Sequence, residues 1–119
     1  MFDRMGYVNV IWQGDANAEA IRALEFATSP PFVVNVTGPE RLSVRDTATR
    51  LGALMGIQPR FEGIEAPDAL LSDTSLAQSR FGLPDVSTDT LIEWVAAWVA
   101  RGGTRLGKAT KFEVRDGRY

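Results

Sequence analysis

Few side chains of this 119-residue chain could carry out catalysis, because it contains neither cysteine nor histidine. Thiol nucleophiles, imidazole acid/base catalysis, disulfides and zinc sites with nitrogen or sulfur ligands are therefore excluded. Only metal sites built from oxygen donors remain. We accordingly predict no catalytic, cofactor-binding or metal-binding residue in the chain.

One segment carries the spacing of a phosphate-binding loop. Residues 102–108, GGTRLGK, match the first seven positions of GxxxxGK. The eighth position is Ala109, where a magnesium-binding Ser or Thr is needed. The segment also follows an expected helix, whereas a phosphate-binding loop follows a strand and opens a helix. A helix end followed by a basic linker explains it better than a nucleotide hydrolase that uses Lys108.

Two pairs of carboxylates and one pair of tryptophans are candidate functional groups. The carboxylates, Asp68 with Asp73 and Asp85 with Asp89, lie at expected helix starts or turns, where they satisfy free amide hydrogens. Trp94 and Trp98 are four residues apart on an expected helix and could stack on a ligand. Neighbouring aromatic residues on a helix are more often part of a core.

Two expected strand-to-helix turns lie where α/β sheets usually bind ligands. Trp12 to Asp15 form the first turn, and residues 35–39 form the second. Neither holds a nucleophile with a positioned base. We therefore expect structural roles, in which Asp15 caps a helix and Asn35 satisfies backbone groups.

The elements that must position these residues alternate between strands and helices. Strands are expected at residues 7–12, 32–36, 59–63 and 112–114. Helices are expected from Asp15 to the Ser29-Pro30-Pro31 stop, from Ser43 to Gly56, at 73–80, and from Ser87 to Gly102. In the first helix an apolar face is expected from Ala20, Ile21, Leu24 and Ala27.

This order predicts an α/β fold. It would be a small two-layer or three-layer fragment with a few short, mostly parallel strands and about four helices. We expect one domain over residues 1–119, with residues 1–6 and 104–119 flexible.

The charge is unevenly distributed along the chain. Residues 1–100 carry 7 basic and 13 acidic side chains, and residues 101–119 carry 6 basic and 2 acidic ones. The overall charge of −2 argues against nucleic-acid binding. No apolar stretch reaches about 20 residues. We therefore expect a cytoplasmic protein without a membrane partner.

Three segments together resemble the carboxyl-terminal part of the extended short-chain dehydrogenase/reductases, the NAD-dependent epimerase/dehydratase family. They are YVNVIWQGDANAEAIRALE from residue 7, FVVNVTGPERLSVRDTATRLGALMG from residue 32, and LLSDTSLAQSRFGLPDVSTDTLIEWVAAWV from residue 70. Asp15, Asn35 and Asp73 are matched positions to which we assign structural roles. The three segments follow one another in the family's order across about 100 of the 119 residues.

The resemblance implies the substrate-binding portion of a longer enzyme. The family's glycine-rich cofactor turn, GxxGxxG, and its catalytic Tyr-x-x-x-Lys have no match, since Tyr7 is followed by Ile11 at the lysine position and Tyr119 is the last residue. This chain is thus expected to bind no cofactor and to be inactive alone. NAD(P) is implied for the full-length protein.

The family's diphosphate-binding arginines are also unmatched, because Glu65-Ala66-Pro67-Asp68 replaces an Arg-x-Gly-Asp stretch. A nucleotide-sugar substrate is therefore in doubt, and a smaller or uncharged carbonyl or hydroxyl compound is an open alternative.

Another class of function stays open beside this one. A free-standing interaction module could hold a protein partner through the Trp94/Trp98 helix or the basic tail. If the chain is a fragment, it would also expose apolar surface and an open strand edge, and such surfaces promote self-association. We therefore expect a homo-oligomer at high concentration.

Overall fold

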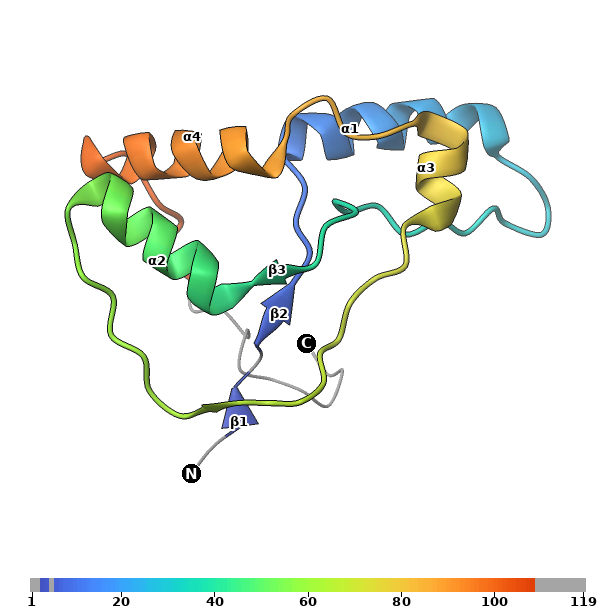
Figure 1. The fold of residues 1–119 in the computed structure, drawn as a ribbon. Helices are drawn as coiled ribbons and strands as arrows, with labels where there is room; N and C mark the ends of the chain where they lie inside the picture. The colour runs from blue at the N-terminus through green and yellow to red at the C-terminus, as the bar shows by residue number, and fades with distance from the viewer. Residues whose placement is uncertain (1–2, 5, 109–119) are drawn as a thin grey trace. The chain divides into compact units, whose positions relative to one another are not determined.

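A computed structural model describes residues 3–4 and 6–108 of the chain (Figure 1). In this part of the chain there are four α-helices, one 3-10 helix and four strands of two residues each. The predicted α/β class, with four helices and a few short strands, is confirmed. In chain order the elements are β1 (Asp3–Arg4), β2 (Tyr7–Val8), α1 (Gln13–Arg22), η1 (Ala23–Phe26), β3 (Leu42–Ser43), α2 (Val44–Met55), β4 (Ile64–Glu65), α3 (Ser75–Phe81) and α4 (Thr88–Ala100).

The strands form two separate pairs of opposite sense. β1 and β4 are parallel, with Asp3 opposite Ile64, whereas β2 and β3 are antiparallel, with Tyr7 opposite Ser43. Mostly parallel strands were expected, and of the two pairs in the described chain the β1–β4 pair is parallel. The contact between the antiparallel strands continues to the start of α2, where the Val44 amide donates to the Gly6 carbonyl at 3.0 Å.

Two of the expected strands are not strands in the structure. Residues 32–36 have the composition of a buried strand, yet they join no ladder in the described chain, and Val33 is 79% exposed. Residues 59–63 also lie outside any strand, and β4 begins immediately after them. β-Propensity measures fit to a pleated neighbour, and neither segment has one here. The strand expected at 112–114 lies outside the described residues.

Helices α2 and α4 begin as the sequence predicts. The Ser43 side chain accepts a hydrogen bond from the Asp46 amide at 3.1 Å, and the Ser87 side chain accepts one from the Thr90 amide at 3.2 Å. Gly56 ends α2 in the left-handed conformation, with φ of 69°, which glycine adopts without strain. These local capping signals do not depend on distant contacts, so the sequence alone identifies them.

Helix α1 departs from the prediction at its start and in its orientation. It begins at Gln13, with Trp12 in the capping position, so Asp15 lies inside the helix and is not its cap. The expected apolar face is exposed, since Ile21 is 69% and Leu24 is 73% exposed, while Asp15 and Glu19 are buried. The hydrogen bond that Asp15 makes elsewhere, described below, turns this acidic face inward.

The chain divides into two compact units. One comprises Met1–Val8, Leu42–Leu70 and Ile92–Tyr119, and the other comprises Asn9–Arg41 and Leu71–Leu91. We call the second one the pocket unit, because it holds the pocket described below. The first contains both strand pairs and α2, and the pocket unit contains α1, η1 and α3.

An aromatic cluster forms the core of the pocket unit. The Phe26 ring lies 5.5 Å from the Phe32 ring and 5.8 Å from that of Phe81, which is buried. Two guanidinium groups cover these rings: Arg22 lies 5.5 Å from the Phe81 ring and also donates to the Phe81 carbonyl, and Arg80 lies 5.4 Å from the Phe26 ring. Arginines stacked on aromatic faces hold α1 and α3 together.

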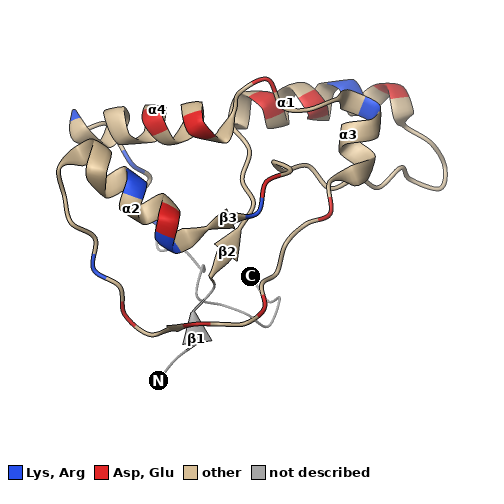
Figure 2. Cartoon of the chain, in the orientation of Figure 1, with Lys and Arg blue, Asp and Glu red and all other residues tan. Residues whose placement is uncertain are grey.

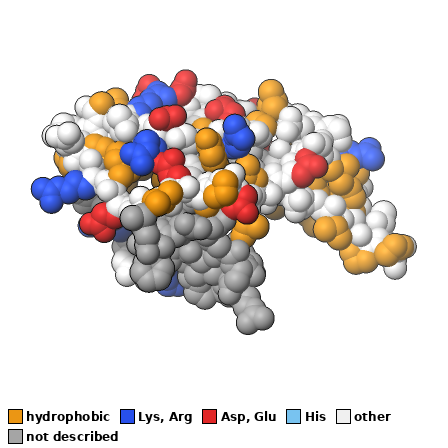
Figure 3. Space-filling model, turned by 60° about the horizontal axis from the view of Figure 1, so that its bottom comes forward, with side chains coloured by type: hydrophobic (Ala, Val, Ile, Leu, Met, Phe, Trp, Pro, Cys, Tyr) orange, Lys and Arg blue, Asp and Glu red, His pale blue; other side chains and the backbone are white. Residues whose placement is uncertain are grey.

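The other unit is stabilised partly by exposed charged groups. Arg45 donates to the Glu65 carboxylate at 2.6 Å and lies 4.3 Å from the Phe61 ring, so it ties α2 to β4. Basic and acidic residues both occur along α2 (Figure 2). Among the residues of this unit whose burial is described, the buried apolar side chains are Ala66, Ile92 and Ala96. Hydrophobic side chains are correspondingly visible at the surface in several separate places (Figure 3).

Candidate functional site

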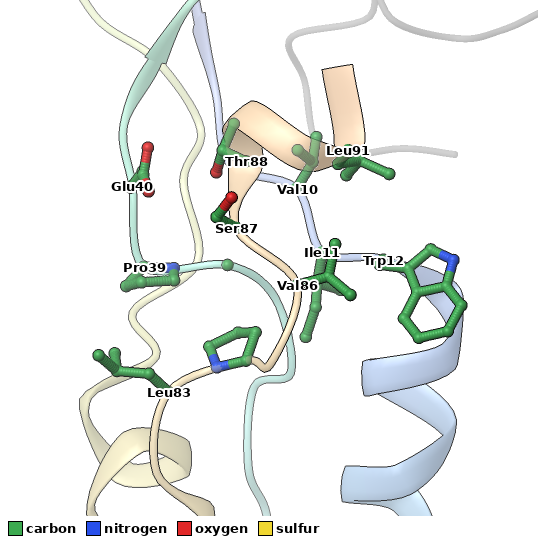
Figure 4. A pocket seen from close by; sticks show the side chains of 12 residues that line it. Val10, Ile11, Trp12, Pro39, Glu40, Leu83, Val86, Ser87, Thr88 and Leu91 are labelled. Carbon is green, nitrogen blue, oxygen red and sulfur yellow. The ribbon is translucent and has the colours of Figure 1, made fainter. Parts of the chain in front are cut away.

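A pocket of about 170 Å³ lies wholly within the pocket unit (Figure 4). Three short segments form its walls: the chain before α1, the turn that follows residues 32–36, and the loop that enters α4. The residues that line it are Val10, Ile11, Trp12, Gly38, Pro39, Glu40, Leu83, Pro84, Val86, Ser87, Thr88 and Leu91.

Gly38 fixes the first wall of the pocket. It is buried, and a Cβ atom at this position would lie 2.0 Å from the Val10 carbonyl oxygen. No side chain fits at that distance, so glycine allows the 38–40 turn to pack directly on the backbone of Val10. This contact places Pro39 and Glu40 beside the chain that leads into α1.

Asp15 fixes the second wall. Its carboxylate is buried and accepts a hydrogen bond from the Val86 amide at 2.9 Å, which joins α1 to the loop before α4. The next residue, Ser87, then caps α4 and also accepts from the Leu91 amide through its carbonyl. Asp15 thus positions lining residues without lining the pocket itself.

Two asparagine side chains hold the segment that enters α3. Asn9 donates to the Ser72 carbonyl at 2.9 Å and accepts from the Ser72 amide at 3.4 Å. Asn35 donates to the Asp73 carbonyl at 3.1 Å. The structure therefore brings Asn35 and Asp73 together, while Asp15 contacts Val86 instead, and none of the three lines the pocket.

The Asp73 carboxylate makes hydrogen bonds to a residue close to it in the sequence. It accepts hydrogen bonds from the hydroxyl and the amide of Ser75, at 2.6 and 2.9 Å, at the start of α3. These bonds favour the ionised form and hold the pKa of the Asp73 carboxyl below its usual value. An exposed carboxylate with a lowered pKa is a poor general base, so this geometry favours a structural role.

The pocket walls are mainly apolar, with three polar side chains. Ser87 is occupied by its hydrogen bonds with Thr90. Thr88 is half-buried, and the exposed Glu40 carboxylate makes no hydrogen bond or ion pair with the described residues. No described Lys or Arg lines the pocket. It can therefore accept hydrogen bonds or a positive charge, but it offers no cation to an anion.

The side chains that line the pocket offer apolar surface, two hydroxyls and one carboxylate to a ligand. Among the described residues, neither hydroxyl that lines the pocket donates a hydrogen bond to a carboxylate or other base, the contact that activates a hydroxyl nucleophile. Within the described residues there is also no group of three acidic side chains that could hold a metal ion.

The segment that matches a phosphate-binding loop comes directly after a helix, as the sequence predicts. Residues 102–108 follow α4 directly, and the Trp98 indole donates to the Thr104 carbonyl at 3.0 Å. A Cβ atom at Gly103 would lie 2.2 Å from this indole, so the glycine allows the chain to cross the ring. The segment packs on its own helix, and this geometry does not form a phosphate cradle. Ala109 lies outside the described residues.

Sequence reasoning missed Glu40 and Thr88. It singled out the 35–39 turn and Trp12, and so stopped one residue short of the carboxylate. Two sequence signals could have found them. Gly38-Pro39 marks one turn, and Pro84 with the Ser87 cap marks another, and each turn leads into a regular element. The contact between those turns is not encoded locally.

No protein-family model, curated protein or solved structure matches this chain. None of the helices in the described ranges combines the length and the apolar character needed to cross a membrane. The pocket and the sequence pattern therefore carry the functional argument.

Proposed function

We propose that this chain is the substrate-binding portion of a longer, cytoplasmic NAD(P)-dependent epimerase/dehydratase and is not catalytically competent alone. One observation carries the proposal. All twelve lining residues come from the three segments that resemble that family, which begin at residues 7, 32 and 70. Segments far apart in the chain thus meet around one pocket.

The nicotinamide cofactor does not fit this pocket. A cavity of about 150 Å³ holds one benzene molecule, and this pocket of about 170 Å³ is far too small for a dinucleotide. Its lining also includes Glu40 and no described cation to meet a diphosphate. The proposal therefore assigns cofactor binding and catalysis to a part of the protein that precedes Met1.

The same features favour a small substrate over a nucleotide sugar. Recognition of a diphosphate relies on arginine donors, and the arginines of the aromatic cluster, Arg22 and Arg80, are stacked on rings. A compact compound with a hydroxyl or carbonyl group is consistent with both the pocket volume and its polar groups.

Calorimetric titration of the 119-residue chain with NAD⁺ and NADP⁺ tests the inactive-fragment proposal. We expect no binding heat from either dinucleotide. A micromolar Kd for either would contradict the proposal, because it would require a cofactor site within this chain.

A second function is favoured by one observation on α4. Trp94 and Trp98 are 48% and 45% exposed, a large apolar exposure for one helix. In a free-standing interaction module these rings would contact a protein partner. Trp94→Ala would then abolish binding of that partner and leave folding intact, whereas unfolding of this variant would show that the ring is part of the core.

A further inference from the structure

We infer that the pocket binds a small amine, an ammonium group carried on an apolar body about the size of one six-membered ring. The inference rests on the proposed function, since it adds a positively charged group to the compact hydroxyl or carbonyl compound proposed for the same pocket. Pocket volume, wall chemistry and charge each contribute to it.

The volume of the pocket accommodates a single ring. A cavity of about 150 Å³ admits benzene, so about 170 Å³ admits a six-membered ring with one or two substituents. A larger ligand could reach out of the pocket beside exposed lining residues, which include Pro39, Glu40 and Leu83.

Apolar side chains from all three segments form most of the wall and suit a hydrocarbon body. The Trp12 ring packs against Gly14 in α1, and it points away from the other labelled side chains (Figure 4). Burying apolar ligand surface in such a site is the main source of affinity. The apolar lining residues are Val10, Ile11, Pro39, Leu83, Pro84, Val86 and Leu91.

The negative charge in and around the pocket favours a positively charged ligand. Glu40 is the one charged residue among those that line the pocket, and it has no partner among the described residues. The pocket unit as a whole has seven acidic and three basic residues. An ammonium group would complement this potential, and a carboxylate or phosphate would be repelled.

The start of α4 does not reverse this preference. A helix N-terminus attracts anions through its free amides. Here the Ser87 side chain already accepts from the Thr90 amide, and Asp89 places a negative charge in the first turn. The Thr88 hydroxyl remains as a polar group that can accept a second N–H from the ligand.

Three ligands with the same ring test the inference: cyclohexylamine, cyclohexanol and cyclohexanecarboxylate at pH 7. Each is titrated into the ¹⁵N-labelled 119-residue chain at low salt, and amide shifts of Gly38, Glu40, Val86, Ser87 and Thr88 are followed. We expect cyclohexylamine to bind at least fivefold more tightly than the carboxylate, with the alcohol between them. One unit-charge interaction at about 4 Å in water corresponds to roughly this factor.

Two variants complete the test. Glu40→Gln keeps the fold because the side chain is exposed, and it should reduce the amine-to-carboxylate ratio to below twofold. Glu25→Gln, a matched exposed carboxylate in η1 outside the pocket, should leave the ratio unchanged. A ratio that survives Glu40→Gln, or one that falls equally in Glu25→Gln, would overturn the role of Glu40.

The outcomes separate the inference from the proposed function. If the alcohol or the carboxylate binds as tightly as the amine, the amine class is wrong and the pocket stands as a binding site. If no ring shifts these amides, the pocket binds no ligand of this size, and the substrate-binding role itself fails with the inference.

Discussion

Replacing Glu19 by glutamine should stabilise the pocket unit. Glu19 lies on the inward face of α1 and is only 6% exposed, and its Oε2 atom is buried without a hydrogen-bond partner. Burial raises the pKa of the Glu19 carboxyl above its ordinary value, the nearby Arg22 charge opposes this shift, and the Asp15 charge adds to it. Ionised Glu19 is therefore an unfavourable group in the folded state.

The size of the effect follows from the unpaired atom. A buried acceptor without a partner costs roughly 1–3 kcal/mol. Glutamine keeps the shape and removes the charge but leaves one polar atom unpaired. We therefore expect Glu19→Gln to raise the free energy of unfolding by about 1 kcal/mol at pH 7, the low end of that range.

The gain should depend on pH in a defined direction. Because the pKa of Glu19 is higher in the folded state than in the unfolded state, ionisation opposes folding. The penalty is absent below the unfolded pKa, near 4.3 for a glutamate, and it grows as the pH rises through the folded pKa. The difference between Glu19→Gln and the native chain should accordingly vanish near pH 3.5.

Urea unfolding at pH 7 and at pH 3.5, followed by tryptophan fluorescence, measures both values. Glu25→Gln serves as the control, because Glu25 is exposed and a surface change of this kind alters stability by only about 0.5 kcal/mol or less. A loss of stability in Glu19→Gln at pH 7, or a gain of equal size at both pH values, would refute the reasoning.

Other predictions follow from the pocket walls and the exposed apolar surface. Gly38→Ala should destabilise the chain by about 1–3 kcal/mol, because its Cβ has no room beside the Val10 carbonyl; unchanged urea unfolding would contradict this. Asp15→Ala should cost about 1–3 kcal/mol by leaving the Val86 amide unpaired, with exposed Asp85→Ala as the control in the same assay. Light scattering should detect a dimer or larger species at high concentration, because Trp94, Trp98 and other apolar side chains are exposed; a clean monomer throughout would oppose the fragment proposal.

The parts of the fold that could be predicted from the sequence are those set by local chemistry. Ser43, Gly56 and Ser87 begin or end helices through hydrogen bonds or backbone conformations within a few residues. Such signals do not depend on contacts with distant parts of the chain. They were therefore sufficient to predict where α2 and α4 lie in the sequence.

The errors arose where distant contacts decide the structure. Residues 32–36 read as a strand, but a strand requires a partner, and the described chain gives them none. In α1, the apolar pattern predicted the wrong inward face, because the bond from the Val86 amide to Asp15 spans 71 residues. No periodicity within the helix could show it.

The candidate site was only partly visible in the sequence for the same reason. Trp12 and the 35–39 turn were identified as a ligand-binding side, whereas Glu40 and Thr88 became candidates only when the turns met around one pocket. Asn9 is another example, since its two hydrogen bonds to Ser72 join residues 63 apart.

Reading the source gene upstream of Met1 tests the central claim most directly. If this chain is the substrate-binding portion of a longer enzyme, an in-frame extension should encode a glycine-rich GxxGxxG turn and a Tyr-x-x-x-Lys motif. A stop codon directly before Met1 would contradict the claim, and the interaction-module hypothesis would then take its place.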